Sequence, residues 1–237
     1  MESTNKSNQI NHLIVGASRG IGRSLLDLSI NTGHAVYALS RSRPESIPSG
    51  CTWIEGDAGQ PESFLDQLPE SIHALTFCPG KVILGPIKRL KSEQMLEAYK
   101  TSVLDAFTLV QSILPRLDGS IAFLSSVAAR TGLPSHCAIS AAKSGLEGFA
   151  IALAADLAPK VRVNVVAPTL TPTAMGVSMV GGEKIIPMIE ERHPLKKIPS
   201  VEEVAATLNF LHSPAASSMT GQIFKIDSGL SQLRLNS

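Results

Sequence analysis

Short apolar runs alternate with longer helical patterns from one end of the chain to the other. The apolar runs cover residues 12–15, 35–39, 52–54, 74–77, 121–124, 161–166 and 223–226. Most of them run without polar alternation, which is typical of strands covered on both faces, as in a parallel sheet. The pattern therefore predicts a parallel sheet of seven strands.

Helical patterns fill the intervals between these runs. They cover residues 21–32, 61–68, 92–114, 138–158 and 201–212. Repetition of strand, helix and strand indicates an α/β fold, a doubly wound parallel sheet of the Rossmann type with helices on both faces and right-handed crossovers. We expect one domain over residues 11–237, preceded by a disordered polar tail over residues 1–10.

Residues 174–200 break this rhythm. The segment contains three glycines, three prolines and three methionines, namely Gly176, Gly181, Gly182, Pro187, Pro194, Pro199, Met175, Met179 and Met188. A connection this long is usually a functional lid or a disordered segment. We expect a substrate lid here, because methionines suit an adaptable apolar cover.

Composition narrows the class of protein. Of 237 residues, 43% are hydrophobic and 17% charged, which is typical of a globular chain. The net charge of +1 argues against a nucleic-acid or anionic-membrane surface. No uninterrupted apolar run reaches the length of a membrane span, and the polar start lacks a signal-peptide core. Three cysteines at unrelated spacings predict neither a disulfide framework nor a metal site, and favour a cytoplasmic location.

A glycine-rich turn follows the first predicted strand and opens a helix. It reads Gly16, Ala17, Ser18, Arg19, Gly20, Ile21, Gly22. Gly16 permits a tight turn, Gly20 lets backbone N–H groups approach a pyrophosphate, and Gly22 allows close helix–strand packing. We expect a dinucleotide here. A glycine-rich turn without a ligand is the alternative.

The end of the second predicted strand indicates which dinucleotide. NAD-binding units usually carry an acid there for the ribose 2′-hydroxyl. This chain has Ser40 and Arg41 instead, and Arg41 with Arg19 is suited to a 2′-phosphate. The predicted cofactor is therefore NADP(H), unless these arginines are only solvated loop charges.

Over residues 11–230 the chain resembles the short-chain dehydrogenase/reductase family. The resemblance rests on the glycine motif, Asp57, the strand ending at Ser126, Lys143 and the segment 162–168. It implies that Asp57 contacts adenine and that Thr173 lies near the nicotinamide amide. The remaining implied cofactor contacts are Ala58, Cys78, Gly80, Lys143 and Leu170. The resemblance also implies a homodimer or homotetramer.

The proton-transfer residues depart from the family pattern. The family's catalytic Tyr lies four residues before the Lys, where this chain has Ile139, and its relay Asn falls near Ser102. Ser126 stands at the family's serine position. His136 lies seven residues before Lys143, as the Tyr does in the enoyl-reductase branch, although it is also interpretable as a loop histidine. The candidate catalytic residues are Ser126, Lys143 and His136.

These observations favour an NADP(H)-dependent oxidoreductase that acts on a small, mainly apolar substrate with an altered proton donor. A catalytically inactive NADPH-binding or partner subunit is one alternative, because an isoleucine cannot donate a proton. A non-redox enzyme on the same fold is another, since a fold does not fix a reaction. Cys78 and Cys137 are interpreted as packing residues and not as nucleophiles.

Overall fold

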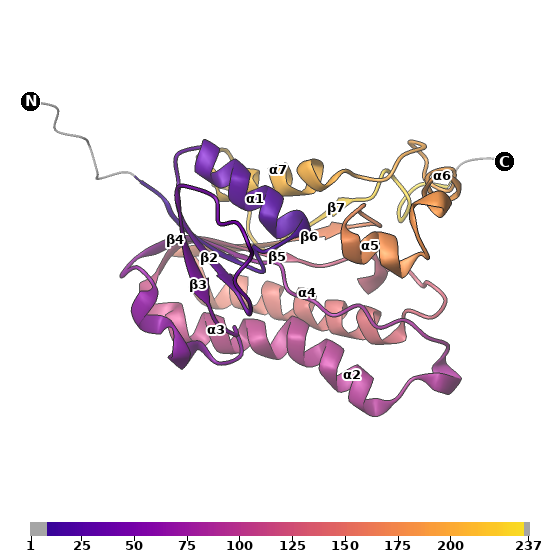
Figure 1. The fold of residues 1–237 in the computed structure, drawn as a ribbon, viewed down its shortest axis with the longest axis horizontal. Coiled ribbons are helices and arrows are strands. Elements are labelled where there is room, and N and C mark those ends of the chain that lie inside the picture. The colour runs from indigo at the N-terminus through magenta and orange to yellow at the C-terminus, as the bar shows by residue number, and fades with distance from the viewer. Residues whose placement is uncertain (1–8, 235–237) are drawn as a thin grey trace, which may run out of the picture.

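The computed structural model describes residues 9–234, and most of the predicted polar tail, residues 1–8, lies outside this range. The seven predicted strands form one parallel sheet in the order β3-β2-β1-β4-β5-β6-β7 (Figure 1). Their bounds are β1 Asn11–Val15, β2 Ala35–Ser40, β3 Cys51–Glu55, β4 Ile72–Phe77, β5 Leu117–Leu124, β6 Val161–Pro168 and β7 Ile223–Ile226. The predicted doubly wound sheet is confirmed.

Helices cover both faces of the sheet (Figure 1). On one face lie α1 (Gly20–Asn31) and α7 (Val201–His212), and on the other lie α2 (Ser92–Tyr99), α3 (Asp105–Ile113) and α4 (Cys137–Leu157). Strand order reverses between β1 and β4, so the carboxyl ends of these two strands border a crevice. That crevice is where an open sheet of this kind binds ligands.

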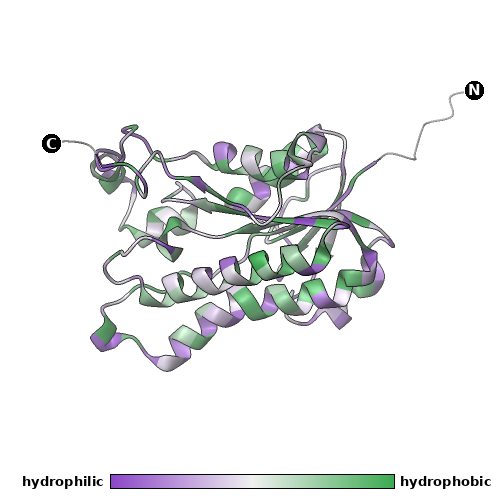
Figure 2. Ribbon diagram, turned by 180° about the vertical axis from the view of Figure 1, so that it is seen from behind, coloured by the Kyte–Doolittle hydropathy of each residue, from purple (hydrophilic) through white to green (hydrophobic). Residues whose placement is uncertain are grey.

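All strands but β4 supply apolar side chains to both of two hydrophobic cores, and the apolar side chains of β4 belong to one of them. In β1, Leu13 and Val15 belong to the core under α3 and α4, whereas Ile14 belongs to the core under α1 and α7. Neighbouring strand residues point to opposite faces, so an uninterrupted apolar run is what a sheet covered on both sides requires. Figure 2 shows hydrophobic residues along the strands between the two helical layers.

The prediction of one helix over residues 61–68 is wrong. Two short 3-10 turns, Pro61–Ser63 and Leu65–Gln67, stand there instead. Phe64 separates them with φ at −146°, outside the helical region, and its side chain is fully buried. Burial of this ring in the core interrupts the helix. The pattern over 92–114 is also divided, because a π-helical turn, Lys100–Leu104, joins α2 to α3.

Residues 174–200 lie beside the carboxyl ends of β5 and β6 (Figure 1). They contain two short helices, α5 (Ala174–Met179) and α6 (Ile186–Glu190). Gly181 and Gly182 between them have φ values of +87° and +116°, a region that favours glycine. The segment is folded onto the rest of the chain, since the Leu195 amide donates a hydrogen bond to the Ser228 carbonyl at 3.2 Å.

Helix α4 is the one helix of the described chain that is long and apolar enough to cross a membrane by length and composition. In this fold it packs against the sheet, with Leu146, Ala150 and Ala154 in the core. Core helices of globular proteins meet the same criterion, so this apolar character is explained by burial.

Candidate active site

The turn after β1 brings two backbone segments closer than a side chain would allow. Gly16 has φ at +81°, and its amide donates to the Leu39 carbonyl at 2.8 Å. A Cβ on Gly22 would lie 2.3 Å from the Gly16 carbonyl oxygen. Only glycine fits at Gly22, so the first turn of α1 sits directly on the loop. The free N–H groups of that turn are an anion-binding feature.

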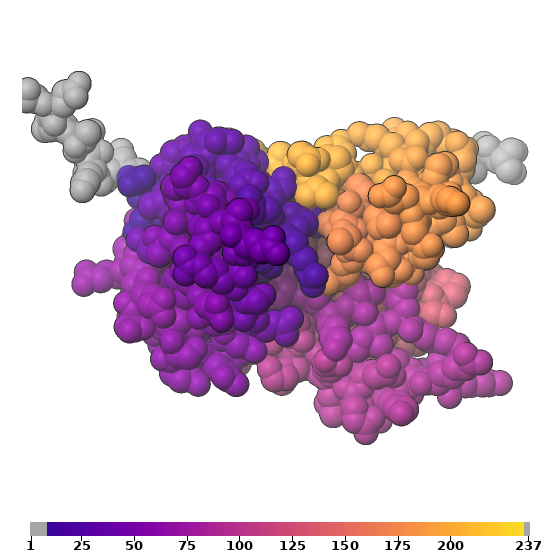
Figure 3. All heavy atoms as spheres, viewed as in Figure 1, coloured from indigo at the N-terminus to yellow at the C-terminus, as the bar shows by residue number. Residues whose placement is uncertain are grey.

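A groove of about 560 Å³ opens over this turn. Most of the predicted cofactor residues line it, namely Gly16, Ser18, Arg19, Gly20, Ile21, Gly22, Ser40, Arg41, Asp57, Ala58, Cys78, Gly80 and Thr173. Lys143 and Leu170 do not, and line the neighbouring cavity instead. In Figure 3, atoms of the N-terminal part of the chain, in indigo, meet the orange atoms of the segment that contains α5.

The outer end of the groove carries two free cations. Arg19 and Arg41 are exposed, and neither forms an ion pair with any residue between 9 and 234. Asp105, which also lines the groove, is paired with Lys100 at 2.7 Å. The Asp105 hydrogen bond raises the pKa of Lys100. Sequence reasoning did not identify Asp105 as a groove residue, because its α3 position carries no motif.

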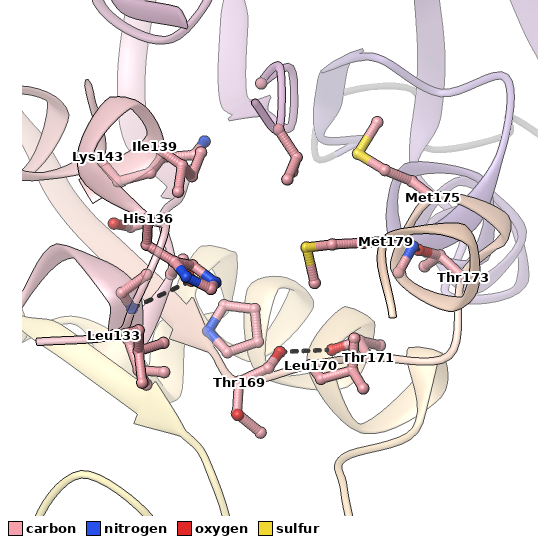
Figure 4. Close-up of a pocket in the computed structure, with 18 of the residues that line it drawn as sticks. Leu133, His136, Ile139, Lys143, Thr169, Leu170, Thr171, Thr173, Met175 and Met179 are labelled. Atoms are coloured by element: carbon pink, nitrogen blue, oxygen red, sulfur yellow. Dashed lines mark hydrogen bonds between the residues drawn. The ribbon is translucent and has the colours of Figure 1, made fainter. Parts of the chain in front are cut away.

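A cavity of about 590 Å³ adjoins the groove. Figure 4 shows Met175 and Met179 on one side of it, facing Ile139, Lys143 and His136 on the other. Two of the three methionines of the predicted lid therefore line the cavity. The third, Met188, is 57% exposed and is not among the lining residues. The groove and the cavity share Ile21, Cys78, Gly80, Leu124, Thr173 and Met175.

Lys143 is buried in the cavity wall, with 5% of its surface exposed. Its Nζ donates to the Leu124 carbonyl at 2.7 Å and to the Pro79 carbonyl at 3.4 Å. Burial lowers the pKa of Lys143 to about 8, against an opposing influence from Cys78 and Glu147. The amine therefore releases its proton far more easily than an exposed lysine.

Ser126 lines the cavity at the end of β5, as predicted. Its hydroxyl oxygen accepts a hydrogen bond from the Ala128 amide at 3.2 Å and caps the short turn Val127–Ala129. The neighbouring Ser125 is oriented otherwise and donates to Glu147 at 2.8 Å. Of the two serines, Ser126 alone lacks a side-chain partner within the described residues.

His136 and Ile139 both precede Lys143 in the sequence and line the same cavity. His136 lies at the start of the helix, and its Nδ1 donates to the Pro134 carbonyl at 2.6 Å. This bond leaves Nε2 as the ring nitrogen able to act elsewhere. Ile139 is buried and lines the cavity one helical turn before Lys143.

Ser102, near which the family resemblance places a relay residue, is fully buried in the π-helical turn. Its hydroxyl has no hydrogen-bond partner among the described residues.

His193 is a cavity residue that sequence reasoning missed. It is buried, and its Nδ1 contacts the Ile189 carbonyl at 2.9 Å while its Nε2 contacts the Thr169 hydroxyl at 3.1 Å. The first bond lies within the segment 174–200, and the second joins the segment to Thr169, the residue that follows β6. No motif surrounds His193, so only the fold reveals this role.

Cys78 lies between the groove and the cavity but is not reactive. Burial raises the pKa of its thiol to about 12, although the Lys143 charge acts in the opposite direction. A thiol that stays protonated is a poor nucleophile. This agrees with the interpretation of Cys78 as a small packing residue.

Comparisons with known proteins converge on one group of enzymes. A family profile described as "Enoyl-(Acyl carrier protein) reductase" matches residues 61–231. Carbonyl reductase (NADPH) 2 of Sus scrofa is 28% identical over 92% of this chain and 94% of its own. Carbonyl reductase family member 4 of Danio rerio is 30% identical over 93% and 98%.

Among solved structures, an oxidoreductase of the short-chain dehydrogenase/reductase family from Burkholderia thailandensis aligns with a TM-score of 0.83. It is 25% identical, and the alignment covers 94% of this chain and 93% of that one. The likeness therefore extends over nearly the whole fold.

Proposed function

Because this chain belongs to the short-chain dehydrogenase/reductase family, we propose that it is an NADP(H)-dependent oxidoreductase acting on a small, mainly apolar substrate. The observation that carries the proposal is the pair of unpaired guanidinium groups, Arg19 and Arg41, at the outer end of the groove. Both lie where the chain has no carboxylate for a ribose 2′-hydroxyl, and guanidinium groups match phosphate oxygens.

The rest of the groove fits such a nucleotide. The glycine turn and the first N–H groups of α1 would hold the pyrophosphate, and Asp57 would contact the adenine end. Thr173 and Leu170 would border the nicotinamide end. When bound, the nicotinamide ring would supply or accept a hydride.

The neighbouring cavity supports an apolar substrate. Its wall includes Leu133, Ile139, Met175 and Met179, so an apolar molecule placed there would bury its surface against apolar side chains and away from water. The segment 174–200 would act as its lid, since it supplies Met175, Met179 and the His193 contact to β6.

Proton transfer in this site needs a donor other than residue 139. Ile139 has no ionisable group, so His136, Lys143 or water would have to provide the proton. Ser126 would orient a polar group of the substrate, because its O–H hydrogen remains free while its oxygen caps the local turn.

Calorimetric titration with NADPH and with NADH tests the proposal. We expect NADPH to bind at least tenfold more tightly, since charged hydrogen bonds to a phosphate contribute about 1.5–3 kcal/mol each. Equal affinities would refute the assignment of Arg19 and Arg41 to a 2′-phosphate. Absence of binding by both nucleotides would refute the oxidoreductase proposal itself.

The buried isoleucine favours a second candidate, a catalytically inactive NADPH-binding or partner subunit. The substitution Ile139→Tyr separates the two candidates. If Ile139→Tyr reduces apolar ketones with NADPH and the unaltered protein reduces neither ketones nor enones, the subunit role is supported. If the unaltered protein already consumes NADPH with either substrate class, the enzyme role stands.

We further propose a homo-oligomer, as the family resemblance implies, in the cytoplasm, which the three cysteines favour. Large apolar side chains are exposed on the outer helices, with Leu96 at 68%, Phe107 at 45% and Ile151 at 44%. A homodimer or homotetramer that covers these residues would remove them from water. Sedimentation of the full chain tests this, and a monomer at micromolar concentration would contradict it.

A further inference from the structure

Lys143 has a surrounding that is unusual for a lysine. No carboxylate lies within ion-pairing distance of it among the described residues. The nearest acid in its electrostatic surroundings, Glu147, is already bound by Ser125 and by Arg130 at 2.8 Å each. The amine therefore faces an apolar cavity without a dedicated counter-ion.

The hydrogen bonds of the amine leave one position on the nitrogen unused. Two N–H groups point to the carbonyls of Leu124 and Pro79. Lys143 lines the cavity, and its Nζ lies against Gly80, which borders both the cavity and the nucleotide groove, since a Cβ on Gly80 would come within 2.8 Å of that atom. Once a proton leaves, the lone pair occupies the remaining position while the other two N–H groups keep their partners.

The protonation balance favours a reactive amine. Since burial lowers the pKa of Lys143 to about 8, a substantial share of the molecules carry a neutral amine at pH 8. For an ordinary lysine the fraction at that pH is below about 1%. Desolvation in an apolar pocket is one of the ways by which proteins activate lysine as a nucleophile.

We propose that Lys143 captures apolar aldehydes and ketones in this cavity as an imine and thereby exchanges their α-hydrogens. The nitrogen lone pair attacks the carbonyl carbon and a C–N bond forms. The oxygen takes up one proton from the nitrogen and one from solvent, the C–O bond breaks, and water leaves as the C=N double bond of the iminium forms. The resulting iminium withdraws electrons, so that the neighbouring C–H bond breaks and its electron pair forms the enamine double bond.

The α-proton passes to His136 Nε2 or to water, and a solvent proton returns to the carbon. Hydrolysis then releases the carbonyl compound and the amine. No electrons are gained or lost overall, and water is the only co-reactant. The activity goes beyond the proposed oxidoreductase function and does not require bound nucleotide.

Reductive trapping tests the capture step. Hexanal, added below the protein concentration at pH 8 with cyanoborohydride, should place a hexyl group on Lys143 at least about tenfold faster than on any exposed lysine. Peptide mass mapping locates the adduct. Lys143→Met should abolish this fast adduct, and Lys160→Arg, at an exposed site beyond α4, should leave it unchanged. Adducts spread evenly over surface lysines would overturn the proposal.

Exchange in deuterated water tests the second step. The α-hydrogens of cyclohexanone should exchange at least tenfold faster with the protein than with Lys143→Met, as followed by proton NMR. Circular dichroism checks that Lys143→Met is folded. Met179→Trp gives a second test, because it keeps the amine but fills the cavity, and it should suppress both signals. Exchange that neither variant affects would overturn the proposal. NADPH binding is measured in a separate experiment, so that a failure of this proposal is distinguished from a failure of the proposed oxidoreductase function.

Discussion

The carboxylate of Glu147 accepts a hydrogen bond from the Ser125 hydroxyl at 2.8 Å, and this contact ties the middle of α4 to the end of β5. Arg130 donates to the other carboxylate oxygen, also at 2.8 Å. Glu147 is fully buried, so these two partners and the nearby Lys143 charge are what compensate its removal from water. The network fixes the end of β5, next to Ser126, relative to the helix that carries Lys143, and both of these residues line the cavity.

Glu147→Gln should therefore destabilise the fold by about 2 kcal/mol, because it keeps one hydrogen bond but removes the charge that Arg130 and Lys143 face. Urea unfolding at pH 7 measures the change. Asp156→Asn, at an exposed position on the same helix, is the matched control and should shift stability by less than about 0.5 kcal/mol. Equal effects of the two variants would show that the network contributes nothing specific.

Gly22→Ala should be among the most damaging single-methyl additions. The new Cβ would lie 2.3 Å from the Gly16 carbonyl oxygen, so either the turn or α1 must move. We expect a loss of about 2 kcal/mol or more in stability and a loss of nucleotide affinity, measured by thermal unfolding and calorimetry. Gly132→Ala, which adds a methyl group to open space, should change neither.

Arg41→Glu should weaken NADPH binding by about 10- to 100-fold and leave NADH binding equal or stronger. This change in cofactor preference follows because the substitution replaces a cation that binds the 2′-phosphate with a carboxylate that accepts a hydrogen bond from the ribose hydroxyl. Arg43→Glu makes the same charge change two residues away, outside the groove, and should alter NADPH affinity by only a few fold. Identical losses in both variants would point to long-range charge alone.

The protein should lose stability in mild acid. On the α1 and α7 side of the sheet, His12 and His212 share hydrogen bonds with Thr76 at 2.9 and 2.8 Å, and both rings are buried. Burial lowers the pKa of His12 well below its usual value. It also lowers the pKa of His212 to about 3, with a further lowering by the Arg162 charge.

Since the folded-state pKa values lie below the unfolded value, the stabilisation is present above pH 6.5 and is lost as pH falls from there toward 3. At pH 5 the titration of His212 accounts for a loss of about 2 kcal/mol, and that of His12 acts in the same direction. Urea unfolding between pH 7.5 and 4.5 measures the slope, and His212→Gln should reduce it. At pH 7.5 the same variant reports only the cost of its lost hydrogen bonds. An unchanged slope in His212→Gln would contradict this origin of acid sensitivity.

The pattern of neighbouring residues along the chain determined most of the strands and the turn after β1. The short apolar runs predicted all seven strands, because in most of them residues covered on both faces leave no polar alternation. The glycine spacing predicted the turn after β1, since positive φ at Gly16 and close approach at Gly22 exclude other residues. The sequence also predicted that Arg19 and Arg41 lie near one groove, because the topology of a parallel sheet brings the ends of β1 and β2 together.

Tertiary packing decided the rest. Burial of Phe64 divided the helix expected over 61–68, and the fold of the segment 174–200 placed His193 against Thr169. The sequence identified Lys143, but only the structure showed that its amine lies in an apolar wall with carbonyl partners and a lowered pKa. These properties depend on residues distant in sequence that meet in the fold. Strand periodicity and turn glycines are properties of neighbours along the chain, and these the sequence determines by itself.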